Sequence, residues 1–197
     1  MTSNRSVDYW PFPLWVAHRG GGLDAPENTM AAFKCGYEHG FRMFECDIKL
    51  SADGVPYLLH DPTLDRTTNV KGAAHRWRWQ DLRALDAGAW HSDAYKNERL
   101  VSLAELARFC IEHDCRLNIE IKPCPGFERI TGARVAEMTQ ELWRDSSDKP
   151  LMTSFDIRCL AASKATAPEL PRGYLVHKFS RQWRTTAIDL QCSVVIV

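Results

Sequence analysis

The sequence predicts an α/β fold in which strands and helices alternate to form a parallel sheet or a barrel. Apolar runs of strand length alternate with segments whose apolar residues recur at helical spacing, an arrangement typical of βαβ units. The chain has 197 residues, the size of one domain, and no linker or internal repeat divides it. Hydrophobic residues make up 45% and charged residues 25%, which is typical of globular proteins and not of disordered chains.

The first predicted elements lie around a string of glycines. The apolar run 14–17 predicts a strand that ends at the sequence His-Arg-Gly-Gly-Gly. A helix is expected between Pro26 and Gly40, because apolar residues recur there at helical spacing and glycine commonly ends a helix. Residues 42–50 alternate between two faces and predict a second strand. An Asp-Gly turn then joins this strand to the extended run 55–59, as in a hairpin.

The next stretch, about 62–100, predicts a small insertion, since it holds three tryptophans and several glycines but little regular pattern. Ser102 is expected to cap the helix that follows, because Glu105 stands three residues later as in a capping box. The rest of the chain predicts strands over 117–121, 151–155, 173–176 and 193–197, and helices over about 131–144 and 156–166.

The charge and cysteine content limit the classes of partner that can be expected. Lys plus Arg and Asp plus Glu each number 25, so no basic excess points to nucleic acid or to an anionic membrane. No stretch approaches the ~20 apolar residues of a membrane helix, and the N-terminus does not resemble a signal peptide. The seven cysteines are scattered without a Cys-x-x-Cys pair, which predicts neither a disulfide framework nor a zinc site. We expect a cytoplasmic protein with a small-molecule partner, without nucleic acid or membrane insertion; the oligomeric state stays open.

Carboxylates stand on two predicted strands at positions that a parallel sheet buries. Glu45 and Asp47 are two residues apart and project to the same face, and Asn118, Glu120 and Lys122 repeat this spacing. Residues near the carboxyl ends of barrel strands face the active site. Three carboxylates converging there repel one another, and a divalent cation removes the repulsion; oxygen ligands favour Mg²⁺ or Ca²⁺ over zinc. The alternative is that these residues are solvated or pair with neighbouring lysines.

Two histidines and two cationic side chains accompany these carboxylates. His18 and His60 each end an apolar run and precede a loop, and an imidazole pKa near 6.5 suits general acid–base work. A structural role is the alternative for either histidine. Arg19 precedes three glycines and can contact phosphate oxygens, and Lys122 can supply a second cation. The set fits hydrolysis of a phosphate ester, in which one histidine activates the attacking oxygen and the other protonates the leaving alkoxide.

Three segments closely resemble the glycerophosphodiester phosphodiesterases, and most closely their cytosolic bacterial form. The segments are HRGGGLDAPENTMAAF at 18–33, FECDIKLSADGVPYLLHDPTLDRTT at 44–68 and LNIEIKP at 117–123. Shorter matches follow at 82–90, 101–106 and 154–156. Because the matches occur in family order over most of the chain, together they are far more specific than any one motif.

This resemblance implies a TIM-type (β/α)₈ barrel with a small insertion, and hydrolysis of glycerophosphodiesters to glycerol 3-phosphate and an alcohol. It implies His18 and His60 as the catalytic acid–base pair. The other implied roles are metal ligation of Mg²⁺ or Ca²⁺ by Glu45, Asp47 and Glu120, substrate binding by Arg19 and Lys122, and support of the site by Asn28.

The end of the chain departs from the family pattern. The chain stops inside the apolar run 192–197, and the family's last two strand motifs do not occur. We therefore expect a single incomplete barrel domain over 1–197, about two strands short of eight. Two alternatives to the diesterase stay open: a lyase related to phosphatidylinositol-specific phospholipases C, and a truncated chain that binds metal or glycerophosphate without turnover.

Overall fold

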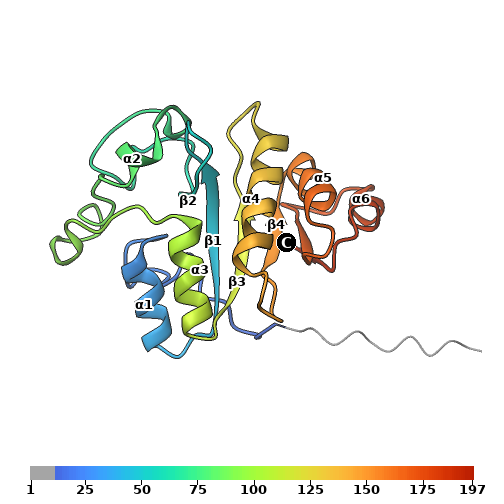
Figure 1. Cartoon of the computed structure of the whole chain (residues 1–197), viewed down its shortest axis with the longest axis horizontal. Coiled ribbons are helices and arrows are strands. Elements are labelled where there is room, and N and C mark those ends of the chain that lie inside the picture. The colour runs from blue at the N-terminus through green and yellow to red at the C-terminus, as the bar shows by residue number, and fades with distance from the viewer. Residues whose placement is uncertain (1–11) are drawn as a thin grey trace, which may run out of the picture.

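The computed structural model describes residues 12–197, which form one six-stranded sheet covered by helices (Figure 1). The strands are β1 (Met43–Leu50), β2 (Pro56–Leu58), β3 (Arg116–Ile121), β4 (Leu151–Ser154), β5 (Arg172–Leu175) and β6 (Val194–Ile196). The α-helices are α1 (Met30–Glu38), α2 (Trp79–Leu82), α3 (Leu103–Glu112), α4 (Glu128–Leu142), α5 (Ile157–Thr166) and α6 (Trp183–Asp189). The sheet has the order β2-β1-β3-β4-β5-β6, with β2 antiparallel to β1 and every other neighbouring pair parallel. The predicted alternation of strands and helices is therefore confirmed.

The main hydrophobic core lies between one face of the sheet and the helices. Phe44, Cys46 and Ile48 on that face of β1 are fully buried. Phe33 of α1 meets Phe44 edge to face, with ring centroids 5.6 Å apart, and Phe109 of α3 packs on the same ring. Each such buried side chain contributes roughly 1.5–3 kcal/mol to folding. Because side chains alternate along a strand, this burial sends the polar residues of β1 to the opposite face.

Both predicted helix starts in this half of the fold are set by side-chain caps. Ser102 caps α3 as predicted: its Oγ accepts a hydrogen bond from the Glu105 amide at 3.2 Å, and the Glu105 carboxylate accepts one from the Ser102 amide at 2.8 Å. Helix α1 begins later than predicted, because Thr29, and not Pro26, supplies the cap by accepting a hydrogen bond from Ala32.

The predicted strand over 14–17 is wrong. Only Ala17 pairs with the sheet, through one bridge in which it exchanges hydrogen bonds of 2.9 Å with Met43 and Glu45. The residues before it are largely exposed, so no apolar face holds them as a strand. Strand β2 uses the same edge of β1 further along, where Leu59 donates to the carbonyl of Asp47. Because β2 runs antiparallel to β1, the segments that follow Ala17 and β2 approach each other along this edge of β1, beside the stretch from Phe44 to Asp47.

The stretch after β2 has more structure than its sequence suggests. It contains α2 and two 3-10 turns, Ala74–Arg76 and Asp93–Tyr95. It also builds a second apolar cluster, in which Leu64, Leu82 and Tyr57 are fully buried. This cluster anchors the stretch beside β2.

Helix α6 was not predicted. Only Ala187 of its seven residues is buried, so no apolar stripe marks it in the sequence. Helices α4 and α5 pack side by side, and in Figure 1 they lie beside β4. None of the helices in the described part of the chain combines the length and the hydropathy of a membrane span.

Candidate active site

Three carboxylates lie together on the face of the sheet opposite the main core. Glu45 and Asp47 come from β1, and Glu120 comes from β3. The strands pair in parallel with Asp47 directly opposite Glu120, so register alone brings two of the carboxylates together. Asp47 is completely buried and Glu45 is 8% exposed. One ligand atom from each of the three lies within 4.8 Å of the others.

The close packing of these acids disturbs their protonation. Burial, together with the charge of Asp47, raises the pKa of Glu45 to about 8. Burial also raises the pKa of Glu120, although contact with Lys122 opposes this shift. The cluster therefore holds protons that carboxylates in water would release, which is the expected sign of uncompensated negative charge.

These residues fit a hard divalent cation. Two buried oxygens, Glu45 Oε1 and Asp47 Oδ1, accept no hydrogen bond from the described residues, and Glu120 Oε1 beside them is paired with the ammonium group of Lys122. Buried carboxylate oxygens are normally satisfied, and two unsatisfied oxygens beside a third carboxylate fit an oxygen-preferring ion such as Mg²⁺ or Ca²⁺. The donor set contains no sulfur or nitrogen, so it does not favour zinc.

The second oxygens of Asp47 and Glu45 are held by the loop that follows Ala17. Asn28 donates from Nδ2 to Asp47 Oδ2 at 2.9 Å and accepts from the Asp47 amide at 3.2 Å. The Arg19 amide donates to Glu45 Oε2 at 3.1 Å, and the Arg19 Nε lies 3.1 Å from Asp47 Oδ2. Arg19 and Asn28 both adopt positive φ, of 54° and 59°, so this loop is wound tightly around the carboxylates. The structure thus brings Arg19 and Asn28 to the predicted site.

Lys122 occupies the opposite side of the cluster. Its Nζ lies 2.6 Å from Glu120 Oε1 and 3.7 Å from Asp47 Oδ1. Lys49, on the same face of β1 as the acids, is 2% exposed and donates to the Lys122 carbonyl at 3.2 Å. Burial lowers the pKa of Lys49. Two ammonium groups therefore stand at the edge of the carboxylate cluster.

The two candidate histidines are held differently. The His60 Nδ1 lies 2.7 Å from Asp61 Oδ1. A hydrogen bond from Arg66 lowers the pKa of Asp61 to about 2, so this carboxylate is ionised at neutral pH and can only accept. The proton of a neutral His60 is thus drawn to Nδ1, which leaves Nε2 unprotonated. The side chain of His18 is 67% exposed and has its Nε2 3.8 Å from Glu45 Oε2. Burial and the adjacent Arg19 lower the pKa of His18.

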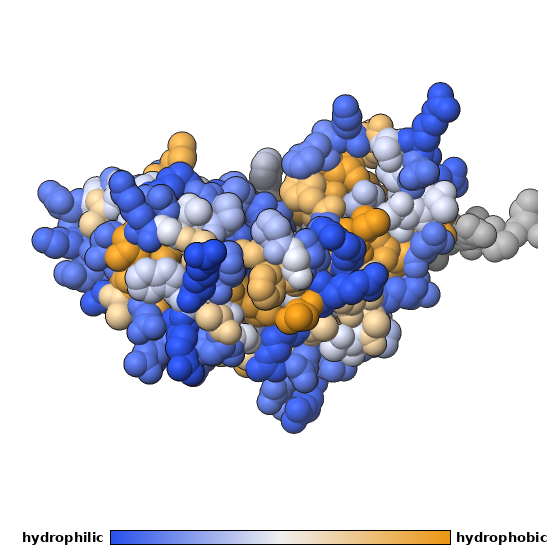
Figure 2. Space-filling model, turned by 90° about the horizontal axis from the view of Figure 1, so that it is seen from above, coloured by the Kyte–Doolittle hydropathy of each residue, from blue (hydrophilic) through white to orange (hydrophobic). Residues whose placement is uncertain are grey.

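A cavity of about 500 Å³ opens onto this group of residues. His60, Lys49, Glu120 and Lys122 line one part of it. The rest of the lining mixes apolar and polar groups, including Phe155, whose ring stacks on His177 with centroids 4.2 Å apart. The volume suits a small organic ligand. Figure 2, the view along β1 from its carboxyl end, shows apolar patches among charged side chains at the surface.

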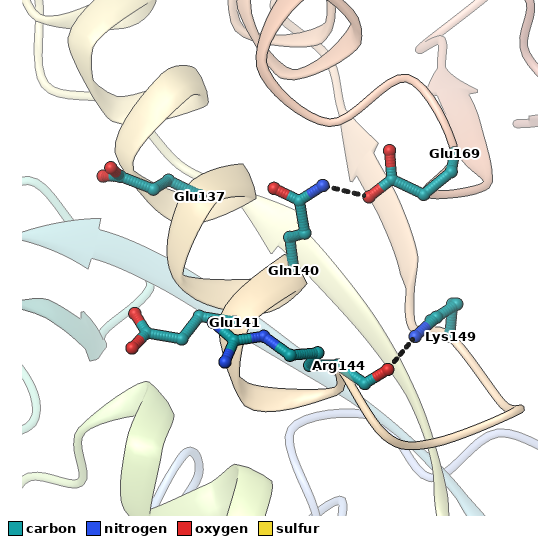
Figure 3. A pocket seen from close by; sticks show the side chains of 6 residues that line it. All are labelled: Glu137, Gln140, Glu141, Arg144, Lys149 and Glu169. Atoms are coloured by element: carbon teal, nitrogen blue, oxygen red, sulfur yellow. Dashed lines mark hydrogen bonds between the residues drawn. The ribbon is translucent and has the colours of Figure 1, made fainter.

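A larger hollow of about 620 Å³ lies elsewhere. Residues of α4 and of the segments after it line this hollow: Glu137, Gln140, Glu141, Arg144, Lys149 and Glu169 (Figure 3). It contains none of the predicted site residues, and the bonds drawn within it in Figure 3 are structural: Gln140 donates to Glu169 at 2.7 Å, and Lys149 donates to the Arg144 carbonyl at 3.2 Å. The chemistry is therefore concentrated in the smaller cavity.

Four charged residues that organise the site were not among the predicted site residues: Glu27, Lys49, Asp61 and Arg66. Asp61 follows His60 directly, and Lys49 continues the alternation of Glu45 and Asp47, so both had a local signal in the sequence. Glu27 and Arg66 are 39 residues apart and meet only in the folded chain.

The comparisons with known proteins agree with this geometry. The model of the Glycerophosphoryl diester phosphodiesterase family matches residues 18–195. The glycerophosphodiester phosphodiesterase of Caldanaerobacter subterraneus is 34% identical over 166 residues, which cover 82% of this chain and 66% of that protein. Glycerophosphodiester phosphodiesterase 1 of Bos taurus is 37% identical over 109 residues, covering 54% of this chain and 33% of that protein. The chain thus spans about two thirds of one relative and one third of the other.

Solved structures show the same fold. An Oleispira antarctica phosphodiesterase, in complex with its product sn-glycerol-3-phosphate, superposes with a TM-score of 0.86 at 33% identity; the match covers 93% of this chain and 74% of that one. A glycerophosphodiester phosphodiesterase from Agrobacterium tumefaciens has a TM-score of 0.78 at 29% identity, covering 91% of this chain and 74% of that one. This likeness confirms the predicted class of TIM-type α/β barrel.

Proposed function

The chain belongs to the glycerophosphoryl diester phosphodiesterase family, and from this premise we propose that it hydrolyses glycerophosphodiesters to glycerol 3-phosphate and an alcohol. The observation that carries the proposal is the cluster of Glu45, Asp47 and Glu120, with unsatisfied oxygens on Glu45 and Asp47, beside two histidines and two cationic side chains. The Oleispira antarctica relative holds sn-glycerol-3-phosphate, which supports a substrate of the same glycerophosphate class.

Glu45, Asp47 and Glu120 would hold one divalent cation, Mg²⁺ or Ca²⁺. When bound, the cation supplies positive charge that stabilises the developing charge on phosphoryl oxygens. Asn28 and Arg19 keep the Asp47 and Glu45 oxygens turned towards this position, since they occupy the other oxygen of each carboxylate. Such supporting hydrogen bonds fix both the orientation and the basicity of ligands.

Arg19 and Lys122 bind the phosphate group in the proposed complex. Both already stand at the carboxylate cluster, Arg19 beside Asp47 and Lys122 beside Glu120. An anionic phosphodiester arriving there would share these cations with the acids and be oriented by them. Lys49 supports this arrangement by holding the Lys122 carbonyl.

His18 and His60 form the proposed acid–base pair. One removes the proton of the attacking oxygen and the other donates a proton to the leaving alkoxide, so each bond change is matched by a proton transfer. The contact with Asp61 leaves Nε2 of His60 available for this work.

The proposal also covers the domain organisation of the chain and its cellular location. We take residues 1–197 as one barrel domain with an insertion at about 62–100, since that stretch has its own apolar cluster. We place the protein in the cytoplasm, because its seven cysteines are free and most of them buried, as suits a reducing compartment.

The products test the reaction directly. Phosphorus NMR of glycerophosphocholine incubated with the chain and Mg²⁺ should show glycerol 3-phosphate as the end product. A cyclic glycerophosphate as the only product would instead indicate the lyase related to phosphatidylinositol-specific phospholipases C.

A further inference from the structure

Arg66 binds two carboxylates that come from separate parts of the chain. Its Nη1 and Nη2 donate to the two oxygens of Glu27, each at 2.7 Å. Its Nε and Nη2 donate to the two oxygens of Asp61 at 2.7 and 3.1 Å. One guanidinium therefore makes four hydrogen bonds and engages both carboxylates in a bidentate manner, the strong geometry for such pairs.

Each of these carboxylates continues to a residue of the site. Asp61 Oδ1 lies 2.7 Å from Nδ1 of His60. Glu27 Oε1 accepts a hydrogen bond from Arg19 Nη1 at 3.0 Å. Arg66 thus joins the loop after Ala17 to the loop after β2, and through Asp61 and Glu27 it is linked to His60 and Arg19.

An ordinary surface ion pair does not account for this arrangement. Isolated exposed pairs contribute about 0–1 kcal/mol, and their geometry is seldom fixed. Here the two acceptor side chains are only 14% and 23% exposed. Without the guanidinium they would be two carboxylates facing each other, and their repulsion would turn Asp61 away from His60.

We propose that Arg66 is a positioning residue of the active site, which holds Asp61 so that His60 keeps its proton on Nδ1, and holds Glu27 so that Arg19 stays beside Asp47. The catalytic consequence rests on the proposed function, but the effect on His60 does not. Because Arg66 belongs to the stretch after β2, this stretch contributes to the acid–base machinery through the Arg66 side chain.

The primary test reads the tautomer of His60 in the full chain. Histidines labelled with ¹⁵N distinguish the Nδ1–H from the Nε2–H form at a pH near 8.5, where unperturbed imidazoles are neutral. The His60 signal is identified by its loss in His60→Gln. We expect one tautomer, Nδ1–H, in the unaltered chain, and a mixture with a substantial Nε2–H share in Arg66→Met.

Two further variants separate positioning from a general effect on folding. Arg66→Lys keeps the charge but can hold only one carboxylate at a time, so the Nε2–H share should be intermediate. Arg134→Met is the matched control: its side chain is also 43% exposed and also pairs with a glutamate, Glu137, but it touches no site residue. This control should keep the single tautomer of the unaltered chain.

Turnover supplies the second readout. Arg66→Met should lower kcat for a glycerophosphodiester by about tenfold or more, with Arg66→Lys between it and the unaltered chain. If Arg66→Met keeps the single Nδ1–H tautomer of His60, the proposal is overturned. If Arg66→Met does not fold, the same result in Arg66→Lys overturns it. If the unaltered chain shows no turnover at all, the proposed function fails, while the tautomer still decides whether Arg66 positions His60.

Discussion

Asn28 and Asp47 hold each other by two hydrogen bonds that run in opposite directions. The Asn28 amide nitrogen donates to Asp47 Oδ2 at 2.9 Å, and its oxygen accepts from the Asp47 backbone amide at 3.2 Å. Both residues are buried. The pair leaves Asp47 Oδ1 as the free oxygen, so the asparagine decides which oxygen the carboxylate offers to a cation.

Replacing Asn28 by alanine should therefore weaken cation binding. Asp47 would lose a donor and could rotate, and loss of such a supporting hydrogen bond typically reduces metal affinity by about 10–100-fold. Titration calorimetry with Mg²⁺ and with Ca²⁺ measures the change. Asn97→Ala is the control, because Asn97 also has a positive φ, of 73°, but lies away from the carboxylates. Equal affinity in the unaltered chain and Asn28→Ala would show that Asn28 does not support the site.

Cation binding should become stronger as the pH rises. The pKa of Glu45 is about 8 without an ion, so below that value the cation must displace a proton. One displaced proton gives about a tenfold gain in affinity per pH unit between about 6 and 8, and a plateau above. In Glu45→Gln the slope should become clearly smaller, because no proton is left to displace at that position. A slope equal to that of the unaltered chain would contradict this assignment.

The same raised pKa makes a prediction for stability without a cation. Between the usual glutamate pKa of 4.5 and about 8, the folded chain binds more protons at Glu45 than the unfolded chain does. The free energy of unfolding should then fall as the pH rises through this window. Added Mg²⁺ or Ca²⁺ should raise Tm more at pH 8 than at pH 5.5, which thermal melts can measure. A larger rise in Tm at pH 5.5 than at pH 8 would contradict this prediction.

Loss of the His60 imidazole should be costly for turnover but not for folding. His60→Ala removes one of the two proposed proton-transfer groups, which is worth roughly 10²–10⁴-fold in kcat. The measurement is kcat for glycerophosphocholine at saturating cation. His39→Ala, at an exposed position at the end of α1, serves as the control and should retain full activity. A His60→Ala variant with unchanged kcat would exclude the acid–base role.

The close approach of α4 and α5 should depend on Gly132. A Cβ atom there would lie 2.3 Å from the Cys159 carbonyl oxygen and 2.8 Å from its Cα, so backbone would have to move. Overpacking of this kind costs about 1–3 kcal/mol, and Gly132→Ala should lower Tm by roughly 2–4 °C per kcal/mol. Glu141→Ala, at an exposed position of the same helix, should change stability by less than about 0.5 kcal/mol. Equal melting temperatures for the two variants would show that the helices can separate freely.

The carboxylate cluster could be predicted from sequence because local alternation determines it. Glu45 and Asp47 must share a face of β1, and the parallel register then sets Asp47 opposite Glu120. Caps are equally local, which is why the start of α3 at Ser102 was predicted correctly. These features need only the period of a strand or the first turn of a helix.

Features that depend on distant contacts could not be predicted. Glu27 and Arg66 have no recognisable relation in the sequence, and only the fold brings them within 2.7 Å. The run 14–17 has the apolar composition of a strand, but only Ala17 reaches β1. Helix α6 has no apolar stripe, so its sequence carries no periodic signal.

The most direct measurement is release of glycerol 3-phosphate from glycerophosphocholine by the 197-residue chain, with Mg²⁺, with Ca²⁺ and with EDTA. The account predicts release with at least one of the two cations and its loss in EDTA, because the three carboxylates cannot stabilise phosphoryl charge without an ion. Undiminished release in EDTA, or no release under any condition by a chain shown to be folded, would contradict it.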